Sequence, residues 1–94
     1  MLYAVKARFR PGMEERRAAL AGEFSQHIRQ PLLHIRLFGV LLDGEGHRSG
    51  MLMLMEADGR SLIDSFLEQS PYARDGLYDG YEIDELQIEA GSLG

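Results

Sequence analysis

Two apolar runs joined by a glycine-rich loop stand at the centre of the sequence, in the stretch HIRLFGVLLDGEGHRSGMLMLME (residues 34–56). The first run, His34–Asp43, and the second, Met51–Glu56, each have the length and composition of a β-strand. The linking DGEGHRSG begins with Asp-Gly and contains further glycines, which tolerate the positive backbone angles of a hairpin loop. The stretch therefore predicts two neighbouring antiparallel strands.

A strand and a helix precede this hairpin. The segment Leu2–Phe9 alternates in polarity, which predicts a strand with one apolar face formed by Tyr3, Val5, Ala7 and Phe9. From Gly12 to about Arg29, apolar residues recur at helical spacing beside charged ones, so we expect a helix of four or five turns that ends near Pro31.

A second helix and a fourth strand follow the hairpin. The segment DGRSLIDSFLEQ predicts a helix in which Asp58 is the N-cap and Leu62, Ile63 and Phe66 form the buried stripe. A short irregular turn, Ser70–Leu77, then leads to a strand over about Tyr81–Ala90, and Gly91–Gly94 is expected to fray.

The order of these elements predicts an α+β fold, the ferredoxin-like βαββαβ plait. It has a four-stranded antiparallel sheet, both helices on one face, and the first strand between the third and the fourth. Ninety-four residues provide material for one hydrophobic core, so residues 1–94 are expected to form a single domain.

Composition excludes several classes of protein. The chain has no cysteine, which rules out disulfides, thiolate metal sites and a cysteine nucleophile. A net charge of −5 argues against nucleic acid as the main partner. The sequence has neither a signal-peptide pattern nor a run of membrane-spanning length, so we expect a cytoplasmic protein. We also expect no cofactor and no metal.

The third strand is apolar on both of its faces, and the second nearly so, although the helices can cover only one face of the sheet. A large exposed apolar patch marks an interface. We therefore expect a homodimer in which two sheets pack face to face.

Few residues suggest chemistry. His27 follows Glu23 by one helical turn, a spacing that suits an acid–base pair or a metal, but no third ligand is evident. Ser70 and Tyr72 flank the turn before the last strand; Ser70 has no evident base to activate it, and Tyr72 has the character of a packing residue.

Two cations lie on the sheet face that points away from the helices. In a dimer, Lys6 and Arg8 could hold a small anionic ligand between the sheets. The alternative is that they pair with carboxylates of the fourth strand: Glu82, Asp84 and Glu85.

Several of these segments together resemble the YciI-like (YCII-related) family of small dimeric α+β barrel proteins. The matching features are GVLLD (39–43) before the glycine-rich loop, Glu56-Ala-Asp58 after an apolar strand, and the Pro71-Tyr72…Gly76-Leu77-Tyr78 turn. The resemblance implies an active site made of a helix-one histidine and an aspartate before Pro-Tyr. Here the aspartate position is Ser70, and the histidine position falls on Phe24 or, with a three-residue shift, on His27.

Three functions follow from these observations. The first is a non-catalytic dimer that binds a small aromatic or anionic molecule in a cleft between the first helix, the Ser70 turn and the sheet, with the binding residues Lys6, Arg8, Phe24, Asp43 and Tyr72. The second is an enzyme, which the resemblance implies to be a lyase, isomerase or dehydrochlorinase. Its acid–base group would be His27, and Ser70 would stand in the second dyad position. Glu23, Asp43 or Tyr72 would assist His27. The third is an accessory dimer without a ligand.

Overall fold

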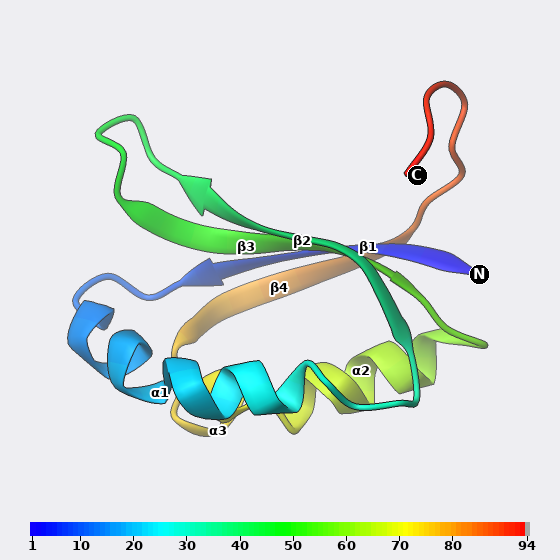
Figure 1. The fold of residues 1–94 in the computed structure, drawn as a ribbon. Helices are drawn as coiled ribbons and strands as arrows, with labels where there is room; N and C mark the ends of the chain where they lie inside the picture. Colours follow the sequence, from blue (N-terminus) through cyan, green and yellow to red (C-terminus); the bar gives the residue numbers. More distant parts are fainter. Residues whose placement is uncertain (94) are drawn as a thin grey trace.

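A computed structural model describes residues 1–93 of the chain. It contains four strands and three helices, drawn in Figure 1: β1 (Leu2–Phe9), α1 (Glu14–His27), β2 (His34–Leu42), β3 (Arg48–Glu56), α2 (Arg60–Glu68), α3 (Pro71–Arg74) and β4 (Tyr78–Glu85). Among these residues no helix has the length and apolar character needed to cross a membrane.

The four strands form one sheet in the order β2-β3-β1-β4, and every neighbouring pair is antiparallel. The predicted α+β ferredoxin-like arrangement is therefore confirmed, including the place of β1 between β3 and β4. In the register, Val5 lies opposite Met53 on one side and Ile83 on the other. These three side chains share a face and are buried, so they form the centre of the core.

All three helices lie against one face of the sheet and leave the other face open (Figure 1). The covered face carries the alternate residues of β1 and β3, including Met51, Met53 and Met55, which are at most 1% exposed. Leu20 and Phe24 of α1 and Ile63, Phe66 and Leu67 of α2 complete the core. The buried stripe of each helix follows from the spacing of these apolar residues.

The open face of the sheet carries the other alternate residues. Leu52 and Leu54 of β3 point to this side, where Leu54 lies opposite Ala4 and Leu37. Leu37 is 45% exposed. Its strand, β2, is an edge of the sheet, and Phe38, Val40 and Leu42 on its other side are also exposed.

Lys6 and Arg8 share this open face. Lys6 lies opposite Glu82 of β4, as predicted. No ion pair joins Lys6 or Arg8 to a carboxylate within residues 1–93. Lys6 is therefore a neighbour of Glu82 in the sheet without forming a salt bridge with it.

Several predicted boundaries are wrong. Asp58 is not the N-cap of α2, because Gly59 occupies that position in an extended conformation and no side chain caps the helix. The first helix begins at Glu14 and not at Gly12, whose φ of +82° belongs to the turn that leaves β1. The fourth strand is Tyr78–Glu85 and not Tyr81–Ala90; the N–H of Leu86 donates to Leu2 O, beyond which the chain leaves the sheet.

The turn predicted for Ser70–Leu77 contains the short helix α3. Pro71 occupies the first turn of α3, where its missing N–H costs no hydrogen bond. Gly76, with a φ of +70°, then directs the chain into β4.

Candidate functional site: a pocket at the hairpin end of the sheet

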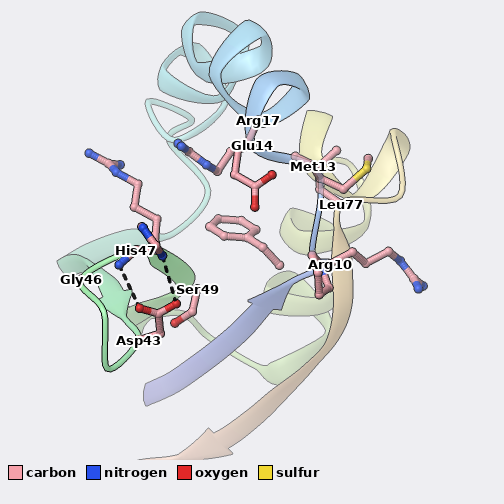
Figure 2. Close-up of a pocket in the computed structure, with 12 residues that line it drawn as sticks. Arg10, Met13, Glu14, Arg17, Asp43, Gly46, His47, Ser49 and Leu77 are labelled. Atoms are coloured by element: carbon pink, nitrogen blue, oxygen red, sulfur yellow. Dashed lines mark hydrogen bonds and ion pairs between the residues drawn. The ribbon is translucent and has the colours of Figure 1, made fainter.

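A cavity of about 610 Å³ lies where the turn from β1 to α1 faces the loop between β2 and β3 (Figure 2). Its apolar part comes from Phe9, Met13 and Leu77, and its polar part from the two loops, the start of α1 and the start of β3. The polar side chains are Arg10, Glu14, Arg17, Asp43, His47, Arg48 and Ser49. The volume is in the range of small-molecule sites.

Asp43 shapes one wall of the pocket. Its Oδ1 accepts hydrogen bonds from the backbone N–H groups of Glu45 (2.8 Å) and His47 (2.9 Å), and Gly46 supplies the positive φ that this tight loop needs. These backbone hydrogen bonds lower the pKa of Asp43 below its ordinary value. The carboxylate is therefore an anion at neutral pH and is already engaged by its own loop.

The imidazole of His47 is exposed at the rim of the pocket. Its Nδ1 lies 3.7 Å from Asp43 Oδ2 and 3.6 Å from Glu45 Oε2, beyond the length of a good hydrogen bond. The ring is thus near two carboxylates but fixed by neither.

The arginines that line the pocket differ in their partners. Arg10 turns away from the cavity (Figure 2): its Nε donates to Gly76 O (3.1 Å), and its guanidinium lies 3.9 Å from Asp79. Arg17 and Arg48 pair with no carboxylate of residues 1–93. The pocket therefore has two cations without a carboxylate partner among residues 1–93.

A layer of aromatic rings lies behind the pocket. Phe9 contacts Tyr72 edge-on with 5.8 Å between centroids, and Tyr72 stacks on Phe24 at 4.2 Å. Burial raises the pKa of Tyr72, while the charges of Arg17 and Arg48 act against this rise. Phe24 and Tyr72, predicted as binding residues, are thus packed against each other and do not line the cavity.

Ser70 is a structural residue in this arrangement. It is 1% exposed, and its Oγ accepts hydrogen bonds from the backbone N–H groups of Tyr72 (3.1 Å) and Ala73 (3.3 Å), which makes it the N-cap of α3. Its hydroxyl also shares a 3.3 Å hydrogen bond with that of Tyr78. Burial raises the pKa of Tyr78 to about 12.

His27 lies away from the pocket, at the end of α1. Its Nε2 is 2.7 Å from the carbonyl oxygen of Phe66, and its ring stacks on that of Phe66 at 4.5 Å. Because a carbonyl can only accept, Nε2 carries the proton. The predicted pairing of His27 with Glu23 is wrong, because the Glu23 carboxylate instead pairs with Arg74 at 2.7 Å.

Of the residues predicted to bind a ligand, Asp43 lines the cavity, whereas Lys6 and Arg8 lie on the open face of the sheet. The other residues that line it were not predicted from the sequence, among them Phe9, Arg17 and Arg48. The one feature of the sequence that could have indicated these residues is the glycine-rich loop, because this loop forms one wall of the cavity. No group of three or more metal-ligating side chains occurs within residues 1–93.

The solved structures that share this fold include the following two. One is 5-chloro-2-hydroxyhydroquinone dehydrochlorinase (TftG) from Burkholderia phenoliruptrix AC1100 in complex with 2,5-dihydroxybenzoquinone, with a TM-score of 0.83 and 22% identity over 93% of this chain and 94% of that chain. The other, from Chloroflexus aurantiacus J-10-fl, has a name that assigns it to the antibiotic biosynthesis monooxygenases; its TM-score is 0.50, with 14% identity over the whole of both chains.

No protein-family model and no curated protein matches the sequence. At these identities the two structures establish the fold and not the activity. The chain is therefore a ferredoxin-like α+β protein, and its place among the YciI-like proteins stays a prediction.

Proposed function

We propose that this protein is a cytoplasmic, YciI-like homodimer that binds a small molecule in the pocket at the hairpin end of the sheet and has no catalytic dyad. The observation that carries the proposal is the cavity of about 610 Å³, which combines an apolar floor with two arginines that have no ion-pair partner among residues 1–93. An apolar cavity with a few convergent polar groups is typical of a ligand site.

The surroundings of His27 and Ser70 argue against catalysis by these two residues. The hydroxyl of Ser70 is buried and caps α3, so it is not presented to a substrate. The Nε2–H of His27 donates to a main-chain carbonyl, and Glu23 is paired elsewhere. Neither residue lines the cavity. A dyad needs two groups within hydrogen-bond reach of each other and of the substrate.

The open face of the sheet favours a second copy of the chain as its cover. Leu37, Leu52 and Leu54 form the apolar half of this face on β2 and β3, while the other half carries Lys6 on β1 opposite Glu82 on β4. A two-fold axis places the same patch on both subunits, so a surface with both charges and one apolar half is complementary to itself.

The binding proposal is tested by a thermal-shift screen with small aromatic and anionic compounds, followed by NMR titration of the hits. A ligand at a hundred times its Kd should stabilise the protein by about 2.7 kcal/mol. We expect the backbone signals of Phe9, Met13 and Ser49 to move. A flat response over the whole library would instead support the accessory dimer without a ligand.

Dehydrochlorination is the second candidate, because the fold is shared with TftG at a TM-score of 0.83. In this reading His27 would act as the base through Nδ1. The assay is chloride release from 5-chloro-2-hydroxyhydroquinone, with His27→Gln as the control. We expect no release above the rate in buffer. Release that disappears in the His27→Gln protein would replace our proposal by the catalytic one.

A further inference from the structure

We infer that the pocket is a receptor for small monoanionic aromatic acids, in which Arg17 and Arg48 bind the carboxylate and Phe9 contacts the ring. This inference rests on the proposed small-molecule function and names the class of ligand.

The first reason is the state of the two guanidinium groups. Elsewhere on α1 and α3 the arginines have acidic partners: Arg16 pairs with Asp75, and Arg74 pairs with Glu23. Arg17 and Arg48 come from different elements, line one cavity and have no carboxylate partner within residues 1–93. Guanidinium groups bind carboxylates through paired charge-assisted hydrogen bonds, which are stronger than neutral ones.

The second reason is that the two arginines come from distant parts of the chain and border the same cavity. Arg17 lies on α1, and Arg48 is the first residue of β3. The positive charges of both favour the ionised form of the Tyr72 hydroxyl, against the larger effect of burial, which agrees with this placement. An anion bound in the cavity could therefore contact both.

The third reason is the apolar floor. The Arg17 Cζ lies 5.9 Å from the centroid of the Phe9 ring, so the cation already sits over an aromatic surface. Met13 and Leu77 border the same floor. A flat ring that carries one carboxylate would place its apolar part on this floor and its charge on Arg17.

The acidic side chains of the pocket limit the ligand to one negative charge. The carboxylate of Asp43 is held by its own loop, and that of Glu14 points into the space between the two loops (Figure 2). Glu14 has no ion-pair partner among residues 1–93. A second anionic group at the far end of the ligand would meet Glu14, whereas a hydroxyl there could donate to it.

The test is an NMR titration with benzoate and with benzamide, its neutral analogue of similar shape. We expect benzoate to bind at least tenfold more tightly, because hydrogen bonds between charged groups are stronger than those to a neutral amide. Arg17→Gln and Arg48→Gln should each raise the Kd for benzoate about tenfold and leave that for benzamide unchanged. Arg29→Gln, which removes an exposed cation outside the pocket, should change neither.

Glu14→Gln provides a gain that unfolding cannot mimic. Removal of its charge should tighten benzoate binding roughly two- to fivefold. Equal Kd values for benzoate and benzamide, or no loss in both arginine variants, would overturn the inference. If other compounds still shift the pocket signals, the small-molecule function survives; if no compound in the screen binds, that function fails as well.

Discussion

At the scale of single residues, Ser70 shows how a position that resembles a catalytic one can be structural. Its hydroxyl accepts hydrogen bonds from two main-chain N–H groups of α3 and contacts the hydroxyl of Tyr78. Serine and aspartate are both favoured N-caps. The YciI-like resemblance implies an aspartate at this position in relatives. Such an aspartate could cap the same helix, so a capping role for this position does not require a catalytic one.

Ser70→Ala should lower the free energy of unfolding by about 1–2 kcal/mol, because it removes the cap of α3 and the partner of the buried Tyr78 hydroxyl. Urea denaturation measures the effect. Ser65→Ala is the matched control, since Ser65 is an exposed serine on α2. Equal stability of the two variants would show that the cap contributes nothing.

The Tyr78 hydroxyl predicts a loss of stability at high pH. Burial raises its pKa from 10.0 to about 12 in the folded protein. The pKa of Tyr78 is higher in the folded than in the unfolded protein. The contribution of its protonated hydroxyl to the free energy of unfolding is therefore fully present below pH 10 and is lost as the pH rises toward 12. The loss should be on the order of 2–3 kcal/mol.

Urea denaturation between pH 9 and 12 measures this dependence. Tyr78→Phe should flatten the curve, whereas Tyr81→Phe, which changes a tyrosine that is 37% exposed, should not. A curve that stays as steep in Tyr78→Phe would assign the loss to another group, such as Tyr72, whose pKa is also raised by burial.

At the scale of elements, the pairing of β1 with β3 depends on one glycine. Gly50 lies opposite Arg8, and a Cβ at this position would overlap the carbonyl oxygen of Ala7. Gly50→Ala should therefore destabilise the protein by about 2 kcal/mol or more, because main-chain atoms must move.

Gly22→Ala is the contrasting variant for this prediction. Gly22 lies in α1, and nothing is within 4 Å of the place that a Cβ would take. The added methyl group should stabilise the helix by about 1 kcal/mol. Thermal denaturation of both proteins measures the two shifts, which should have opposite signs.

The first strand was predictable because its alternation in polarity reports directly on burial. Val5 and Ala7 of β1 are fully buried, and the methionines of β3 lie on the same face. The helix starts and α3 were less predictable. Gly59 caps α2 through its main-chain conformation alone, and α3 is four residues long, too short to show a periodic pattern.

The pocket was only partly predictable. Asp43 could be anticipated because an aspartate before a glycine commonly accepts the N–H groups of its own turn. Arg17 and Arg48 could not, since an arginine on an exposed helix face or in a loop looks the same in the sequence whether it faces solvent or a cavity. Their convergence depends on how two distant turns fold toward each other.

At the scale of the whole molecule, the sheet has one face covered by helices and one without cover (Figure 1). Leu54→Glu, on the open face, should raise the dimer Kd roughly 100-fold, because it would bury a charge without a partner. Sedimentation equilibrium should then give the mass of one chain at micromolar concentration, where the unchanged protein is expected to give the mass of two.

Leu32→Glu is the control for this experiment, since Leu32 is 73% exposed before β2 and lies outside the sheet. It should leave the mass unchanged. A mass of one chain for the unchanged protein would refute the proposed dimer.

The exposed edge strand β2 also affects solubility. Between His34 and Leu42 it has no lysine or proline to discourage strand addition, and its exposed side chains include Leu37, Phe38 and Val40. Main-chain groups along such an edge can recruit further chains without limit and start fibril growth. If nothing covers this strand, we therefore expect it to promote aggregation during expression and storage.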